Sequence, residues 1–202
     1  MLDLGGRPLL VATHNRGKLE EIAELLRPFG VAVVSAGDLG LPVPEETEAS
    51  FAGNARIKAH AGAKASGLVA LADDSGLSVD ALGGAPGVLT ADWAETGQGR
   101  DFSIAMARLR RELLAAGAVE PWTAQFNCTL ALAWPDGQDR IFAGVMPGRI
   151  VWPPRGSEGH GYDPVFQPDG ADLTFGEMDR WQKNRISHRA RAFAKFVEEC
   201  FT

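Results

Sequence analysis

The chain has 202 residues, of which 45% are hydrophobic and 23% are charged, and its formal net charge is −6. This composition is typical of a globular protein, and the length suits one large domain or two lobes that share a core. The negative charge argues against a protein that coats nucleic acid, because a polyanion-binding surface usually makes its domain basic. The five tryptophans and one tyrosine also lack the basic interleaving of a stacking groove.

Cysteine content and hydropathy indicate the compartment. Cys128 and Cys200 have no metal-ligand spacing, which favours a reduced protein without disulfides. No apolar run approaches the ~20 residues that span a bilayer, and the N-terminal residues do not have the pattern of a secretory leader. We therefore expect a cytoplasmic protein with neither membrane nor nucleic-acid partners.

The first half of the chain predicts alternating strands and helices. A strand at 9–12 precedes a helix whose apolar residues recur at helical spacing through Leu26, and a second strand is expected at 31–35. Ser50 is placed to cap a helix over about 51–65. The apolar run 68–72 reads as a buried strand, and 73–87 is polar and glycine-rich, which predicts loop or turn over most of its length.

The second half predicts a helix, an antiparallel meander and a closing helix. Asp101 begins a helix that ends near Gly117. Alternating apolar residues at 126–134 and the return at 141–145 predict a hairpin. A third strand is expected at 149–152 after the turn MPG, and 153–166 is expected to be loop. The last helix is expected from about Ser187, so the sum is a mixed α/β protein.

A dense polar turn, THNRGK at 13–18, joins the first strand to the first helix. Such a turn presents backbone N–H groups and the positive end of the helix to an anion, and Lys18 would add a full charge. The turn is not a P-loop, because Leu19 stands where Ser or Thr would bind the metal. Taken alone, the turn fits an exposed loop with a capping Asn15 better than an anion site.

Two adjacent carboxylates, Asp73 and Asp74, follow the strand expected at 68–72, the usual place for ligand sites in open α/β sheets. One aspartate would hold Mg²⁺, which prefers oxygen ligands and shares its coordination sphere with phosphate oxygens. The other would cap the loop backbone as an Asx-turn. The acidic run Glu45, Glu46 and Glu48 by itself indicates a solvated surface.

Two later segments, GHGYDP at 159–164 and KNRISHRAR at 183–191, supply glycines, cations and imidazole. Glycines allow close backbone approach, and Lys183, His188 and Arg189 have donors that suit a base edge or a phosphate. Taken singly, His188 fits a surface residue at a helix N-terminus, and Arg189 fits a solvated helical face.

In chain order, six motifs resemble those of the non-canonical purine nucleoside triphosphate pyrophosphatases, the inosine/xanthosine triphosphatase family. The motifs are VATHNRGK, EETEASFAGNARIKA, LADDSGLSVDALGGAPGV, GYDPVF, TFGEM and KNRISHRARA. They extend from about Leu9 to Phe196. Six motifs in this order are far more specific than any one of them.

The resemblance implies a single ITPase-like domain over residues 1–202 with an α/β fold of the Maf/ITPase type. This fold is an elongated two-lobed mixed sheet with flanking helices and a nucleotide cleft between the lobes. The resemblance also implies a homodimer and Mg²⁺-dependent hydrolysis of ITP, dITP or XTP to the monophosphate and pyrophosphate. Such hydrolysis needs charge neutralisation by metal and lysines and a positioned water, and it needs no Ser or Cys nucleophile.

Carried onto this sequence, the resemblance makes Asp74 the catalytic base and a metal ligand, with Glu46 as a second metal ligand. His188 and Arg189 would read the 6-keto group that distinguishes hypoxanthine and xanthine from adenine. The implied substrate-binding residues are Thr13, His14, Asn15, Arg16, Gly17, Lys18, Lys58, Ser75, His160, Gly161, Tyr162, Asp163, Lys183, His188 and Arg189.

Several positions depart from the family pattern. His160 stands where relatives usually carry an aromatic residue that stacks on the base, and Asp92 replaces a usual arginine. The other departures are Gly53, Leu89, Thr90 and Met146. Pyrophosphohydrolysis is expected because the phosphate positions and Asp74 are intact. Two alternatives stay open: a relative with shifted base specificity, and a nucleotide-binding sensor that has lost turnover.

Overall fold

The computed structural model describes residues 2–14 and 16–201 and divides into two compact units. Unit 1 takes in the described parts of 1–74, 129–143 and 192–202, and unit 2 takes in 75–128 and 144–191. Three strands and one helix contribute residues to both units, so neither unit is one continuous stretch of chain. The assignment of residues 1–202 to one domain stays a prediction.

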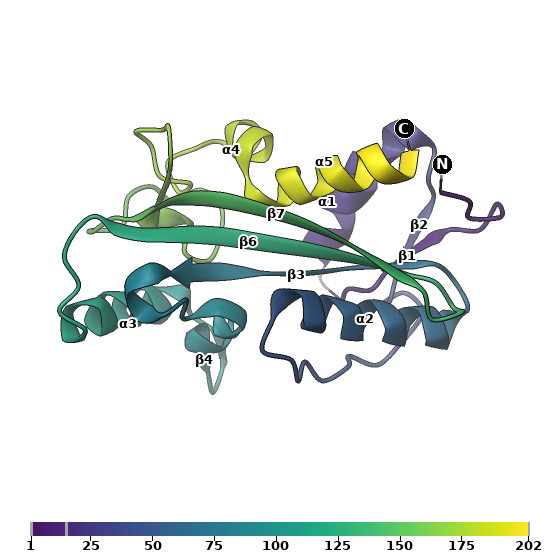
Figure 1. Cartoon of the computed structure of the whole chain (residues 1–202), viewed down its shortest axis with the longest axis horizontal. Helices are drawn as coiled ribbons and strands as arrows, with labels where there is room; N and C mark the ends of the chain where they lie inside the picture. The colour runs from purple at the N-terminus through teal and green to yellow at the C-terminus, as the bar shows by residue number, and fades with distance from the viewer. Residues whose placement is uncertain (1, 15, 202) are drawn as a thin grey trace. The chain divides into compact units, whose positions relative to one another are not determined.

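Six strands pair in the order β2-β1-β3-β6-β7-β8, and β4 and β5 form a separate ribbon (Figure 1). Their bounds are β1 Leu9–Val11, β2 Val33–Ser35, β3 Ala70–Val79, β4 Glu95–Thr96, β5 Gly99–Arg100, β6 Trp122–Ala133, β7 Asp139–Ile150 and β8 Phe166–Pro168. Strand β1 is parallel to β2 and β3, whereas β7 and β8 are antiparallel. The mixed α/β class, with parallel strands early in the chain, is confirmed.

The helices are α1 Arg16–Leu26, α2 Phe51–Ser66, α3 Phe102–Ala115, α4 Arg180–Ile186 and α5 His188–Phe201. The predicted starts of α2 and α3 are confirmed by their caps, because Ser50 Oγ accepts from Gly53 N and Asp101 Oδ1 accepts from Ser103 N. Helix α4 was not predicted. Among the described residues, no helix is long and apolar enough to cross a membrane.

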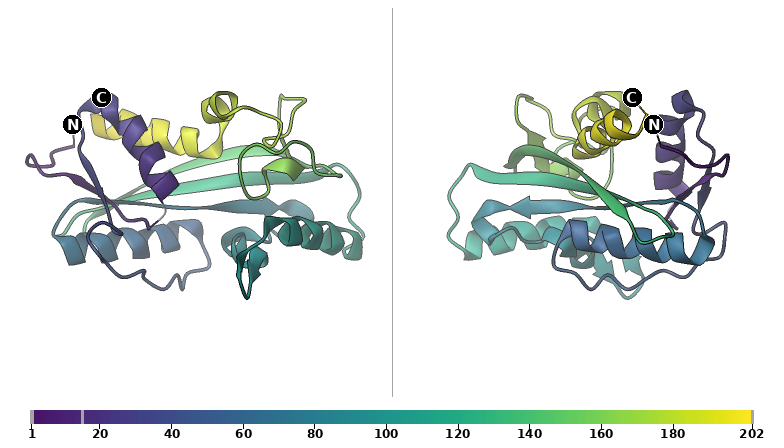
Figure 2. Two further views of the ribbon diagram at one scale, coloured as in Figure 1. Left: turned by 180° about the vertical axis from the view of Figure 1, so that it is seen from behind. Right: turned by 45° about the vertical axis from the view of Figure 1, so that its right-hand side comes forward.

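In unit 1, helix α2 packs closely on one face of the strands because both surfaces consist of small residues. The contact joins Leu10, Ala70, Ala72, Ala131 and Ala133 to Ala55, Ala59 and Ala63. At Gly62, a Cβ atom would come within 2.9 Å of Leu10 Cδ2, so a larger residue there would require the Leu10 side chain to shift. Helix α1 and the second half of α5 cover the opposite face of these strands (Figures 1 and 2).

In unit 2, helix α3 buries Ala105, Leu109 and Leu113 in a core that also holds an aromatic group. The aromatic group consists of Phe126, Phe166 and Phe175, whose ring centroids lie 4.7–6.0 Å apart. We call these three rings the unit 2 aromatic cluster. It joins β6, β8 and the loop after β8 into one packed body.

Two predictions about strand bounds were wrong. The polar segment after residue 72 was expected to be loop, but β3 continues to Val79, with Leu77 and Val79 buried. The turn MPG and a separate third strand at 149–152 were also wrong, because β7 runs without a break to Ile150. Pro147 is accommodated because it lies just beyond the residues of β7 that pair with β8, where its missing N–H leaves no ladder hydrogen bond unmade. Its carbonyl oxygen still accepts from Asp169 N at 3.0 Å.

Candidate functional site

The polar turn after β1 lies beside β3 because these two strands are hydrogen-bonded neighbours in unit 1. Lys18, in the first turns of α1, donates to both carboxylate oxygens of Asp73 at 3.0 and 2.8 Å. The Asp73 side chain is only 5% exposed. Asp73 therefore lies inside a strand and pairs with Lys18, in place of the expected capping position in a loop. Asn15 lies outside the described residues.

Asp74, the next residue of β3, pairs with the helix on the other side of the strand. Successive side chains of a strand point to opposite faces, so Asp73 meets a lysine of α1 and Asp74 meets a lysine of α2. Lys58 Nζ lies 3.1 Å from Asp74 Oδ1 and 2.9 Å from Glu46 Oε1. We call Glu46, Lys58 and Asp74 the acidic triad; it carries two carboxylates and one lysine.

Burial and the neighbouring charges together shift the pKa of two members of the acidic triad. Burial is the largest influence on Lys58 and opposes its charge, but Asp74 and Glu46 outweigh it and raise the pKa of Lys58. Burial is also the largest influence on Asp74 and raises the pKa of its carboxyl group. Lys58 opposes that rise, while Glu46 and Asp73 add to it.

The acidic triad fits a divalent cation by its donor set. Asp74 Oδ2 is buried and has no hydrogen-bond partner among the described residues. A buried carboxylate oxygen without a partner is costly, and a hard cation with oxygen ligands would satisfy it. The described residues contain no ready-made group of three or more metal-binding side chains. Any cation would therefore take further oxygens from water or a ligand.

His14 fastens the polar turn to the segment that leads to Glu46. Its Nε2 lies 2.7 Å from the carbonyl oxygen of Leu41, so this nitrogen carries the proton and donates. Gly37 N donates to the carbonyl oxygen of Thr13 at 3.4 Å, which is a second hydrogen bond between the polar turn and this segment. Arg16 is exposed at the start of α1, and Gly17 lies within α1.

In unit 2, Asp163 organises the loop that carries His160. Its carboxylate accepts from the backbone N–H of His160 at 2.8 Å and pairs with Lys183 Nζ. A Cβ atom on Gly159 would overlap Asp163 Oδ2, so the loop closes tightly around this carboxylate. His160 itself is exposed. Gly161, with φ +70°, allows the left-handed backbone that the loop needs.

Tyr162 lies in the core of unit 2, with 1% of its surface exposed. Its hydroxyl donates to the carbonyl oxygen of Thr90 at 3.2 Å, and burial raises its pKa well above the ordinary value. Its ring meets Phe102 edge to face at 5.8 Å. These contacts hold the loop 159–164 against the body of unit 2, and contact of Tyr162 with a nucleotide stays a prediction.

His188 is not the surface residue that its position in the sequence suggested. It is the first residue of α5, is buried, and stacks on Phe126 with ring centroids 4.8 Å apart and planes 14° apart. Arg189, the next residue, is half-buried, and Ser75 is half-buried in β3. Sequence reasoning missed Phe126, because a phenylalanine in an alternating strand is typical of any core.

The departures from the family pattern include buried, half-buried and exposed positions. Met146 is buried in the core of unit 2, and Thr90 Oγ1 accepts from Leu77 N at 2.9 Å. At Gly53, a Cβ atom would come within 2.5 Å of Glu48 Cβ, so the glycine makes room for that side chain. Leu89 and Asp92 are exposed, as is His160.

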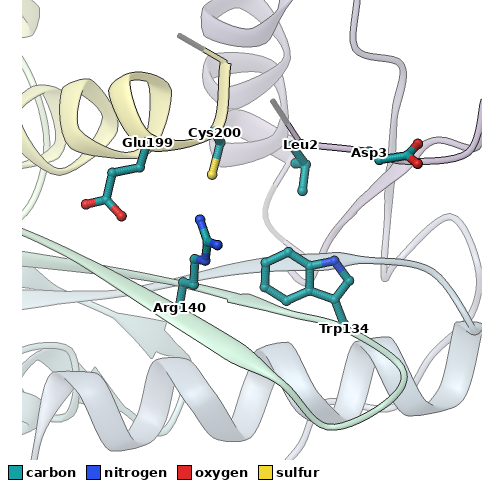
Figure 3. A pocket seen from close by; sticks show the side chains of 6 residues that line it. All are labelled: Leu2, Asp3, Trp134, Arg140, Glu199 and Cys200. Atoms are coloured by element: carbon teal, nitrogen blue, oxygen red, sulfur yellow. The ribbon is translucent and has the colours of Figure 1, made fainter.

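A pocket of about 210 Å³ in unit 1 lies near the chain ends (Figure 3). It is lined by Leu2, Asp3, Trp134, Arg140, Glu199 and Cys200. None of these residues was predicted to bind a ligand. The pocket therefore carries no part of the candidate site.

Comparison with known proteins confirms the resemblance seen in the motifs. The chain belongs to the Ham1 family, which matches residues 9–199. A protein of Ruegeria pomeroyi named dITP/XTP pyrophosphatase is 66% identical over 196 residues, covering 97% of this chain and 96% of the relative. One of the same name from Agrobacterium fabrum is 54% identical over 211 residues, covering 99% of each.

Solved structures agree with the fold. The structure of a HAM1 protein from Coxiella burnetii has a TM-score of 0.90 and 36% identity, covering 98% of each chain. A protein of Mycobacterium abscessus described as nucleoside-triphosphatase / dITP/XTP pyrophosphatase has a TM-score of 0.78 and 41% identity. That match covers 95% of this chain and 99% of the other.

Proposed function

We propose that this chain hydrolyses non-canonical purine nucleoside triphosphates, such as ITP, dITP and XTP, to the monophosphate and pyrophosphate. The observation that carries the proposal is the pairing of Lys18 with Asp73 and of Lys58 with Asp74 and Glu46 in unit 1. Close relatives named dITP/XTP pyrophosphatase support the same activity.

The two lysines supply the positive charge that a triphosphate needs. Carboxylates already hold each lysine side chain in place. Neither side chain therefore has to become ordered when phosphate oxygens replace or share these contacts. The polar turn, with Thr13, His14, Arg16 and Gly17, supplies backbone donors at the start of α1. We also assign Asn15 to this phosphate-binding turn on the basis of the motif.

Asp74 and Glu46 would hold Mg²⁺, and the unsatisfied Oδ2 of Asp74 is the atom that supports this assignment. When bound, the cation would neutralise phosphate charge and lower the pKa of a water molecule. Asp74 would accept a proton from the attacking water. The water oxygen then bonds to the α phosphorus while the bond from that phosphorus to the α,β-bridging oxygen breaks, and pyrophosphate leaves with the bridging oxygen.

Unit 2 carries the groups that would recognise the base. Lys183, His188 and Arg189 present donors, which suit a 6-oxo acceptor and would oppose the 6-amino donors of adenine. A buried donor left unpaired costs ~1–3 kcal/mol, so we expect roughly tenfold to hundredfold discrimination against ATP. Ser75, Gly161, Tyr162 and Asp163 would shape the surroundings of base and sugar.

A shifted base preference is the second candidate function. The observation that favours it is His160, an exposed imidazole between two glycines where relatives usually stack an aromatic ring. Imidazole is smaller than those rings, so it offers less stacking surface to the base. The homodimer stays a prediction of the resemblance.

The test is pyrophosphate release from ITP, dITP, XTP, GTP and ATP, with Mg²⁺ and with EDTA. The proposal expects metal-dependent release selective for ITP, dITP and XTP, which Asp74→Asn abolishes. Asp169→Asn, at an exposed carboxylate of unit 2, is the matched control and should keep wild-type activity. Preference for another base would favour shifted specificity, and binding without release would make the protein a sensor.

A further inference from the structure

The base-recognition groups of unit 2 rest on the aromatic cluster. Phe126 stacks on His188 at 4.8 Å with nearly parallel planes, and Lys183 Nζ lies 5.3 Å from the centroid of Phe175. Phe126 and Phe175 are themselves in contact, with centroids 6.0 Å apart. His188 and Lys183, which the proposed function assigns to base recognition, therefore both pack against the unit 2 aromatic cluster.

Phe126 is held in place by the two other rings of the unit 2 aromatic cluster. It is 7% exposed in strand β6, and it meets Phe166 edge to face at 4.7 Å. Phe166 is fully buried in β8. Because cores are close-packed, the Phe126 ring has little freedom to rotate away from the imidazole.

The backbone at His188 is fixed independently of the stack. Ser187 N donates to the carbonyl oxygen of Lys183, and Ser187 Oγ accepts from Ala190 N at 3.2 Å, which caps the first turn of α5. With the backbone fixed, the direction of the imidazole N–H groups depends on the two side-chain torsions. A parallel ring on one face restricts both torsions.

We propose that Phe126 is a positioning residue that sets the plane of the His188 imidazole and so contributes to base selectivity. This inference rests on the proposed function, in which His188 reads the 6-oxo group. Phe126 acts through His188 and would not touch the nucleotide. An aromatic residue at position 126 thereby serves recognition as well as packing.

The test compares the ratio of kcat/KM for ITP to that for ATP in four variants. Phe126→Leu removes the ring, and Phe126→Tyr restores one of similar shape. Phe142→Leu is the matched control, because Phe142 is a buried phenylalanine of unit 1 that contacts Phe196. The fourth variant places Phe126→Leu in a His188→Ala background, and the His188→Ala protein is measured as its reference. If the wild-type protein binds without turnover, calorimetric Kd values give the same ratio.

We expect Phe126→Leu to lower the ITP:ATP ratio by about twofold to tenfold, the range that a paired aromatic contact contributes. Phe126→Tyr and Phe142→Leu should keep the ratio, and Phe126→Leu should have no further effect without His188. NMR of the four histidines should show His188 ring signals moving downfield when the stacked ring is lost.

An unchanged ratio in Phe126→Leu, an equal change in Phe142→Leu, or an effect that persists without His188 would overturn the positioning role. The failure of the proposed function looks different. In that case the wild-type protein does not prefer ITP to ATP, or His188→Ala leaves the preference unchanged, and the positioning role falls together with the base assignment.

Discussion

Lys58 lies between two carboxylates. This arrangement predicts that replacing Lys58 destabilises the folded protein more than replacing Asp74. Lys58→Met leaves Glu46 and the largely buried Asp74 without their lysine partner and should lower the free energy of unfolding by about 3 kcal/mol, the low end for breaking a buried ion pair. Asp74→Asn leaves Lys58 paired with Glu46 and should cost less. Urea unfolding measures both values.

The matched control for this asymmetry is Lys64→Met, on the same helix. Lys64 is exposed in the last turn of α2, so its replacement should change the free energy of unfolding by no more than about 0.5 kcal/mol. Equal losses in Lys58→Met and Lys64→Met would show that the acidic triad is not coupled as described.

The raised pKa of Asp74 predicts an acid limb in the pH profile of kcat/KM. A general base works only when ionised, so activity is present above the folded pKa and is lost as pH falls through it. Because that pKa is raised, the limb should lie above the range of an ordinary carboxyl group. A bound cation favours the ionised form, so saturating Mg²⁺ should move the limb to lower pH. A limb that does not respond to Mg²⁺ would argue against Asp74 as metal ligand and base.

At the residue scale, the sequence motifs identified the residues of the candidate site better than the contacts that those residues make. Asp74, Lys58 and Glu46 were singled out from the motifs and lie together in unit 1. The pairing of Lys18 with Asp73 depends on β1 and β3 being neighbours, which no local pattern specifies. The stack of Phe126 on His188 joins residues 62 positions apart, and periodicity carries no information at that separation.

At the element scale, Gly148 shows how β7 can pass through a segment with turn residues. A Cβ atom there would overlap the carbonyl oxygen of Gln167 and come within 2.7 Å of Phe166 Cζ in β8. Gly148→Ala should therefore lower the free energy of unfolding by about 2 kcal/mol, measured by urea titration. Gly97→Ala, where a Cβ atom meets nothing within 4 Å, is the control and should cost little.

The misread strands share a physical cause. Strand propensity is low in the segment Asp73, Asp74, Ser75 and Gly76, and the sequence MPG is typical of a turn. Both segments nevertheless lie within strands. Strand formation depends more on pairing and burial than on intrinsic preference, so neighbours in the sheet decided both cases. Caps are local, which is why Ser50 and Asp101 were identified correctly from sequence.

At the scale of the whole molecule, the account predicts that Mg²⁺ stabilises the protein. A ligand that binds only the folded state at a hundred times its Kd adds about 2.7 kcal/mol to the free energy of unfolding. We expect such a gain in the wild-type protein, reversed by EDTA. Asp74→Asn should lose most of it, while NaCl of equal ionic strength should not reproduce it.

The central claim is tested most directly by identifying the products of ITP with ³¹P NMR in the presence of Mg²⁺. The account predicts inosine monophosphate and pyrophosphate in equal amounts, with no inosine diphosphate and none of these products from the Asp74→Asn protein. Release of inorganic phosphate with inosine diphosphate would place the broken bond elsewhere and contradict the account.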